Sequence, residues 1–186
     1  MQHSDAYWKM RRKIAMDLGY QIEEIQTEKK SSKQEGDMYK TILVPLDGSK
    51  RAEAILPHVK NLSLCFNSKV IFFIVAEPSL MLEYDEVIDM SKYLAIRDHQ
   101  KKETETYLAS LQEKFRAKGI KVQTLIGHGL IVEAIIDAAK RENADLLAMA
   151  SHGRSGLSRT FYGSIAAGVL QRIDRPLLLI RSRQND

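Results

Sequence analysis

One loop of the sequence, residues 151–164, holds the residue types best suited to chemistry. A continuous apolar run, Leu146–Ala150, stops where the loop begins, and glycines follow at 153, 156 and 163 among serine, threonine and arginine. Glycines allow backbone N–H groups to approach phosphate oxygens, and the N-terminus of a following helix adds partial positive charge. The loop therefore predicts an anion site.

The spacing within this loop excludes two common phosphate motifs. Neither GxxxxGK[ST] nor GxGxxG can be placed on it, which argues against P-loop hydrolase and ordinary dinucleotide chemistry. Ser164 stands where a helix begins, so it is either a plain N-cap or a donor to phosphate. Arg154 and Arg159 either pair with phosphate oxygens or are ordinary exposed loop arginines. His152 lacks the Ser/Asp partners of a base, and the five histidines show no metal-ligand spacing.

The elements that must position this loop alternate along the chain. Strands are predicted at 40–46, 69–76, 121–127, 144–150 and 176–182, and helices at 51–66, 104–119, 130–143 and 164–173. This alternation predicts an α/β fold, Rossmann-like, with an open parallel five-stranded sheet and helices on both faces. Ligands bind such sheets beyond the carboxyl ends of the strands, where the strand order reverses. Pro57 is expected to bend the first helix, and Gly119 to end the second.

Composition divides the chain near residue 38. Residues 1–37 hold seven basic and seven acidic side chains, so the net charge of +4 belongs to the remainder. We interpret 1–37 as a helical or flexible extension and 38–186 as the folded domain. Basic residues at 11–13 could contact an acidic partner or lipid, although a solvated helix face is the simpler interpretation. The mild charge, with acidic residues spread among the basic ones, does not predict DNA binding.

The remaining composition predicts a soluble, cytoplasmic, reduced protein. The single cysteine, Cys65, excludes an intrachain disulfide and is expected to be buried on the apolar side of a helix. The longest apolar run, Val70 to Ala76, is too short to cross a bilayer, and the N-terminus has no signal-peptide core.

The domain at 38–183 resembles the universal stress protein family. The resemblance rests on "ILVPLDGS", "VIFFIVAEP", "IGHG", "ADLLAMASHGRSGLSRTFYGS" and "RPLLLIRS". The ATP-binding branch of that family carries G-x2-G-x9-G-[ST]. One register fits the end of this motif: nine residues separate Gly153 from Gly163, and Ser164 follows. Ala150 then takes the first glycine position, and Gly156 becomes a turn residue.

The resemblance implies strand order 3-2-1-4-5 and an adenine-nucleotide site. Asp47 would accept hydrogen bonds from ribose or adenine, because a carboxylate repels a triphosphate at close range; the alternative is an Asx-turn in "DGS". Val75 and Met149 would border the adenine, or be simple core. The implied site residues are Pro45, Asp47, Val75, Gly127, Met149, Ala150, His152, Gly153, Arg154, Gly163, Ser164 and Ile165.

Three functions remain open at this stage. The preferred one is an ATP-binding stress or signalling protein with slow or no turnover, since no general base, Walker lysine or acidic metal cluster can be identified. Mg²⁺ or Mn²⁺ could arrive with the nucleotide. The second is a slow ATPase or nucleotide-transfer enzyme. The third is a sensor that binds AMP, a cyclic nucleotide or a protein partner, because Ala150 adds a methyl group beside the pocket.

The last predicted strand, "PLLLIRS", also predicts self-association. It is strongly apolar and lies close to the end of the sequence, and an uncovered apolar edge strand is an association site. The resemblance implies a homodimer paired through this strand, with Leu177 and Leu179 in the contact. The alternatives are a strand inside the sheet, or one covered by residues 1–37, which could also bind an unknown protein partner.

Overall fold

The computed structural model describes residues 38–76, 90–151 and 163–181, which belong to one unit, Lys33–Asp186. In chain order the elements are β1 (Thr41–Leu46), α2 (Lys50–Glu53), α3 (Leu56–Phe66), β2 (Lys69–Ala76), α4 (Met90–Arg116), β3 (Lys121–His128), α5 (Ile131–Arg141), β4 (Leu146–Ala150), α6 (Ser164–Arg172) and β5 (Leu177–Ile180). The predicted strands are therefore confirmed with ends that differ by one or two residues.

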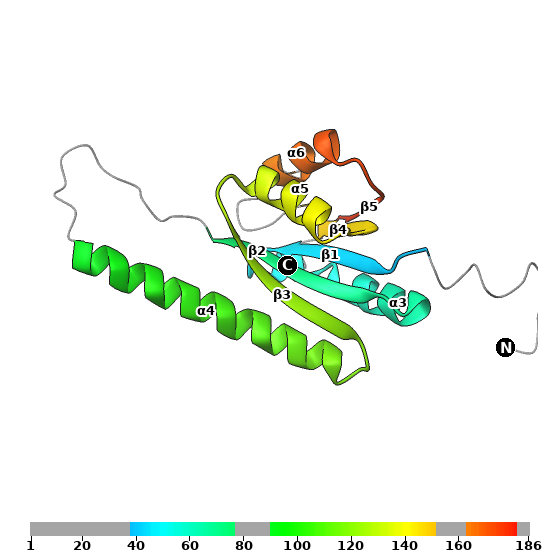
Figure 1. The fold of residues 1–186 in the computed structure, drawn as a ribbon, viewed down its shortest axis with the longest axis horizontal. Helices are drawn as coiled ribbons and strands as arrows, with labels where there is room; N and C mark the ends of the chain where they lie inside the picture. The colour runs from blue at the N-terminus through cyan, green and yellow to red at the C-terminus, as the bar shows by residue number, and fades with distance from the viewer. Residues whose placement is uncertain (1–37, 77–89, 152–162, 182–186) are drawn as a thin grey trace, which may run out of the picture. The chain divides into compact units, whose positions relative to one another are not determined.

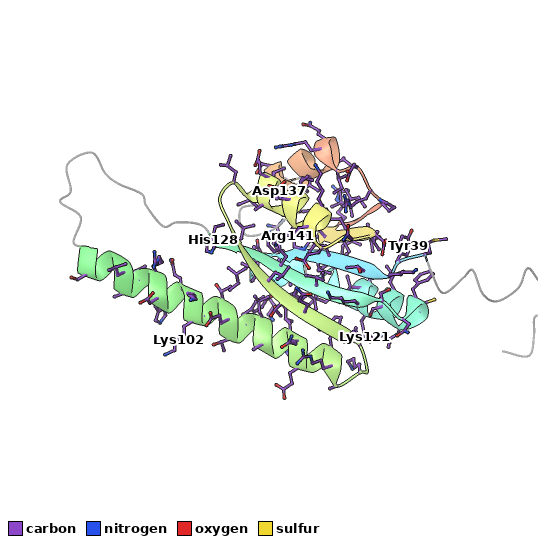
Figure 2. The ribbon with its side chains drawn as sticks, viewed as in Figure 1. Tyr39, Lys102, Lys121, His128, Asp137 and Arg141 are labelled. Carbon is purple, nitrogen blue, oxygen red and sulfur yellow. The ribbon has the colours of Figure 1, made fainter. Side chains whose placement is uncertain are left out.

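The five strands form one sheet in the order β3-β2-β1-β4-β5, and every neighbouring pair is parallel. The predicted Rossmann-like fold and its strand order are confirmed. Parallel strands place all their carboxyl ends on one edge of the sheet. Figure 2 shows this direction in β3, with Lys121 at the start of the strand and His128 at its end.

Helices cover both faces of the sheet, which explains why the strands are continuously apolar. On one face, Ile42, Val44 and Val70 pack with residues of α3 and α4 such as Val59 and Leu111. On the other face, a second cluster joins the sheet to α5 and α6; its central members are Leu43, Ile71, Phe73, Ile135, Leu147 and Val169. Figure 1 shows α5 and α6 on the side of the sheet opposite α4.

Pro57 divides the predicted helix at 51–66 instead of bending it. The single turn of α2 ends at Glu53, and α3 starts at Leu56 with Pro57 in its first turn. Proline has no backbone N–H, and the first turn of a helix is the place where that N–H has no helical partner. The proline therefore starts a second helix.

α4 begins much earlier than predicted. The pattern indicated a helix at 104–119, whereas α4 starts at Met90 and ends at Arg116, three residues before Gly119. The C-terminal half is anchored by buried Leu108, Leu111 and Phe115, and the Phe115 ring meets Phe72 edge-on at 5.0 Å between centroids.

The N-terminal half of α4 lacks this anchor. Residues 94–103 are all exposed. The positions two and three helical turns before Leu108, on the same face of the helix, carry the charged residues Lys101 and Arg97 in place of apolar ones. A hydrophobic pattern detects only a helix face that packs. The sequence therefore revealed the buried half of α4 and missed the exposed half.

The prediction of a buried Cys65 is wrong, because its side chain is exposed. Val59 and Ser63 are the buried residues of α3 and define its inner face. Cys65 lies two residues beyond Ser63, which at 3.6 residues per turn points it away from the sheet. Leu64 beside it is 53% exposed. The apolar content of this helix was misleading because the direction of each side chain decides burial.

Gly127, near the end of β3, makes room for a buried aromatic ring. Gly127 pairs with Val75 on β2, and a Cβ atom added to it would lie 2.4 Å from Phe73 Cζ. Phe73 is 1% exposed and belongs to the core beneath α5 and α6. Any side chain at 127 would therefore push the ring into packed neighbours.

We predict that Gly127→Val lowers the free energy of unfolding by about 1–3 kcal/mol, the usual cost of overpacking a core. Thr124→Val is the matched control, since it places the same residue, valine, at a half-buried position of the same strand where a branched side chain is already present. Urea unfolding followed by circular dichroism would compare the two variants. Equal stability of both would contradict the steric role of Gly127.

Candidate functional site

The site lies where the strand order reverses, between β1 and β4. These strands pair at Ile42 with Leu146 and at Leu43 with Leu147, and their ladder ends there. The ladder between β1 and β2 continues as far as Leu46. Both β1 and β4 run on for three more residues toward the carboxyl edge of the sheet, beyond their last paired residues. This is the position at which open α/β sheets bind ligands.

Pro45 lies in the part of β1 that pairs with β2 but is no longer paired with β4. It is buried, and it sits two residues beyond the last pair with β4. Proline is confined in sheets to places where no ladder hydrogen bond is needed. A proline inside a central strand was thus a sequence signal for the position where the ladder stops.

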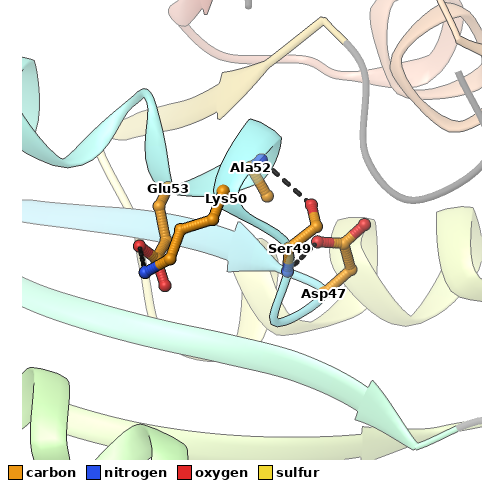
Figure 3. A network of polar contacts seen from close by, with 5 residues as sticks. All are labelled: Asp47, Ser49, Lys50, Ala52 and Glu53. Atoms are coloured by element: carbon orange, nitrogen blue, oxygen red, sulfur yellow. Dashed lines mark hydrogen bonds and ion pairs between the residues drawn. The ribbon is translucent and has the colours of Figure 1, made fainter.

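Asp47 starts the turn that follows β1 (Figure 3). The Ser49 N–H donates to Asp47 Oδ1 at 2.9 Å, and Gly48 between them has a φ of 80°, which favours glycine. Ser49 Oγ in turn accepts from the Ala52 N–H at 3.1 Å and caps α2. The Asx-turn considered for Asp47 is therefore present.

The carboxylate of Asp47 lies apart from the ion pair that follows it in the chain. Lys50 Nζ pairs with Glu53 Oε2 at 2.9 Å, and Figure 3 shows that pair on the opposite side of the turn from Asp47. Asp47 is half-buried at the end of β1. A carboxylate offers about four lone-pair positions, and the Ser49 N–H occupies one of them.

Ser151 joins β4, β5 and α6. Its N–H donates to the Ile180 carbonyl at 2.7 Å, and its own carbonyl accepts from the Gly163 N–H at 2.9 Å. Ser151 is 1% exposed. The two ends of the predicted anion loop are thus held together at the carboxyl end of β4, and the start of α6 is fixed there.

Gly163, not Ser164, is the N-cap of α6. Its φ and ψ are −60° and 155°, and no side chain among the described residues caps the helix. Ser164 is the first residue of the helix and is exposed. The N-cap interpretation of Ser164 is therefore wrong. The first turn contains no acidic residue, so nothing on it offsets the partial positive charge of the helix end.

The remaining described candidates lie at the same edge of the sheet. Met149 and Ala150 end β4 and are each 6% exposed, and Ala150 pairs with Ile180 of β5. Val75 and Ile165 are half-buried and pack against the core cluster beneath α5 and α6. Side chains alternate along a strand, so Met149 faces that cluster and Ala150 faces the α2–α3 side.

Three candidates, His152, Gly153 and Arg154, lie outside the described residues, as do Gly156, Arg159 and the extension at 1–37. Within the described ranges, no group of three or more His, Cys, Asp or Glu side chains could hold a metal ion. None of the described helices combines the length and apolar character needed to span a membrane.

Two parts of the site were not foreseen from the sequence. The sequence showed Ser151 only as the residue that follows an apolar run. Its role in joining three elements uses backbone groups, which every residue has, so the residue type could not predict it. The end of the β1–β4 ladder after Leu43 coincides with Pro45, which has no backbone N–H to donate. The donors of this site, backbone N–H groups at a helix start, suit an anion such as phosphate.

An open parallel α/β sheet in the order 3-2-1-4-5, with a helix starting beside its order reversal, defines the Rossmann-like class of folds. Residues 38–181 match the Universal stress protein family, so this chain belongs to that family.

Several curated proteins are similar to this chain in sequence. "Universal stress protein MJ0577" of Methanocaldococcus jannaschii is 26% identical over 159 residues, which cover 80% of this chain and 98% of the relative. "Universal stress protein Sll1654" of Synechocystis is 28% identical over 143 residues, with coverage of 77% and 86%.

Solved structures show the same fold. The structure of MJ0577 matches with a TM-score of 0.70 and 28% identity, covering 80% of this chain and 99% of that one. A universal stress protein in complex with cAMP matches at a TM-score of 0.59 and 20% identity, with coverage of 78% and 99%. A family member from Arabidopsis thaliana with AMP bound matches at 0.55 and 15%, with coverage of 78% and 94%.

Proposed function

We propose that this chain binds an adenine nucleotide, ATP, at the carboxyl edge between β1 and β4, in a stress-response or signalling role with slow or no turnover. The observation that carries the proposal is the N-terminus of α6, fixed at the end of β4 by the hydrogen bond from Gly163 to Ser151. The helix start presents backbone N–H groups and partial positive charge beside the loop that the motif identifies.

The two ends of the nucleotide are assigned by charge. Phosphates belong at Gly163 and Ser164, where backbone N–H groups and the Ser164 hydroxyl can donate. Arg154 would add charge from the loop. The nucleoside belongs at Asp47, whose carboxylate would repel phosphate but can accept from ribose or adenine.

The most specific part of the proposal is the identity of the bound nucleotide. Two proteins of this fold carry cAMP and AMP, which supports adenine nucleotides as the ligand class. Ala150 replaces the first motif glycine and keeps AMP or a cyclic nucleotide as alternatives to ATP. Mass spectrometry of the ligand released from purified protein under denaturing conditions would identify which one is bound. Steady phosphate release from ATP would instead favour the slow ATPase.

Gly163→Val is expected to abolish nucleotide binding while the fold survives. A φ of −60° and ψ of 155° are accessible to valine, so the backbone need not change. The branched side chain would nevertheless block the approach of phosphate to the N–H groups of the helix start. Isothermal titration calorimetry with ATP measures the effect.

Gly163→Ala is the matched control for this variant, since it adds one methyl group and should bind with intermediate affinity. Circular dichroism would establish that both variants are folded. Wild-type affinity in folded Gly163→Val would remove the phosphate assignment.

Asp47→Ala should weaken adenine nucleotides by about 1–3 kcal/mol, because it leaves ligand donors unpaired. Inorganic triphosphate, which lacks the nucleoside, should bind as before. Asp47→Asn separates the two roles of this residue, since asparagine can still accept from the Ser49 N–H and preserve the turn. Equal weakening of both ligands by Asp47→Ala would show that Asp47 acts through the turn alone.

We further propose that the chain forms a homodimer through β5. This strand is at the edge of the sheet, and all four of its residues, Leu177–Ile180, are apolar yet only half-buried. Pairing two such edges about a two-fold axis covers them and closes the assembly. The nucleotide edge stays outside this contact. A protein partner bound through residues 1–37 and a cytoplasmic location also remain predictions.

Leu179→Lys should convert the dimer to a monomer, because it places a charge within the paired edge. Leu170→Lys is the matched control: this leucine on α6 is 49% exposed, and the same substitution there should leave the dimer intact. Light scattering would measure both, together with a truncated chain that begins at Asp37. A truncated chain that stays monomeric at high concentration would contradict pairing through β5.

A further inference from the structure

α6 contains a glycine in its interior, Gly168, for which its backbone conformation gives no reason. Among the described residues, the glycines with positive φ are Gly48, Gly119 and Gly129, so Gly168 has ordinary helical geometry. A glycine at such a position costs about 1 kcal/mol relative to alanine. An interior helical glycine therefore calls for a packing reason.

That reason is the neighbouring helix. A Cβ atom added to Gly168 would lie 2.9 Å from Val132 Cγ2 and 3.5 Å from Val132 Cγ1. Val132 belongs to the first turn of α5, which follows the end of β3. The absence of a side chain at 168 thus allows α6 to lie closer to α5 than any other residue would.

Further contacts hold α6 in this position. Arg172 at its C-terminal end donates to Glu133 of α5, and this hydrogen bond holds the pKa of the Glu133 carboxyl below its usual value. Beyond the helix, Arg175 Nη1 donates to the carbonyls of Ala139 and Ala144 at 2.6 and 2.9 Å. At the other end, Gly163 is bonded to Ser151. Gly168 therefore lies between the contacts that hold the two ends of α6.

We propose that the close contact of Gly168 with Val132 positions the N-terminus of α6 and thereby sets the affinity of the site for the phosphate groups of its ligand. The proposal rests on the nucleotide site argued above. Gly168 is a positioning residue in this account, because it acts through the helix and does not touch the ligand.

The reach of this effect follows from helix geometry. Gly163 lies five residues before Gly168, or about 7.5 Å along the axis. A helix pushed outward at Gly168 while its C-terminal end stays attached to α5 must tilt, and its first N–H groups then move. Hydrogen bonds to phosphate tolerate only a few tenths of an ångström in length. Asp47 belongs to the turn after β1, so the nucleoside end does not depend on α6.

The test measures ATP and adenosine affinity by calorimetry for Gly168→Ala, Val132→Ala and the double variant. Gly168→Ala should weaken ATP about tenfold, near the loss of one charge-assisted hydrogen bond, and leave adenosine unchanged. Val132→Ala removes the opposing methyl groups, so the double variant should recover wild-type ATP affinity. Val132→Ala alone measures the effect of removing these methyl groups and is the reference for the double variant.

A purely structural role for Gly168 predicts that Gly168→Ala loses stability and weakens ATP and adenosine alike. In the proposed role ATP binding alone falls, and the variant should melt within a few degrees of the wild type because alanine favours helices. Wild-type ATP affinity in Gly168→Ala would overturn the proposal, and so would equal weakening of ATP and adenosine. Should Gly168→Ala fail to fold, Val132→Ile enlarges the other side of the same contact and should show the same ATP-specific loss.

Failure of the nucleotide site itself would be recognisable in the wild type. A wild-type protein that binds neither ATP nor adenosine overturns both the proposed function and this inference. A wild-type protein that binds ATP, together with variants that bind it equally well, overturns the positioning role alone.

Discussion

The hydrogen bond between the Gly163 N–H and the Ser151 carbonyl is the contact on which the rest of the site depends. It joins the end of a central strand to the start of a helix, and Ser151 is bonded in addition to the edge strand β5. The two ends of the glycine-rich loop thereby meet at a fixed point beside the helix start, where backbone N–H groups can be presented to a ligand.

The described glycines of this chain serve different physical purposes. Gly48 supplies a left-handed turn, Gly127 leaves space for the Phe73 ring, and Gly168 lets two helices approach. Gly163 has ordinary extended geometry, so its value lies in the access it leaves to the backbone. Counting glycines in a motif cannot separate these purposes, because each depends on which atoms occupy the neighbouring space.

The sequence predicted most of the fold because parallel, doubly covered strands are apolar throughout, and such runs are easy to read. The five strands and the helices after β3 and β4 followed from this pattern. The start of α4 at Met90 could not be predicted, because no apolar stripe marks the exposed half of this helix. Gly163 was predicted as a site residue from motif spacing and Asp47 from the family resemblance. The roles of Ser151 and Gly168 arise from backbone and steric contacts between elements distant in sequence.

The exposure of Cys65 has a practical consequence for work on this protein. The chain has a single cysteine, and it lies near the end of α3, just before β2 starts at Lys69. It is therefore at the amino edge of the sheet, away from the strand ends where Asp47 and Gly163 lie. A fluorophore or spin label attached to this thiol would report on the protein from one defined point, without an introduced cysteine and without crowding the opposite edge.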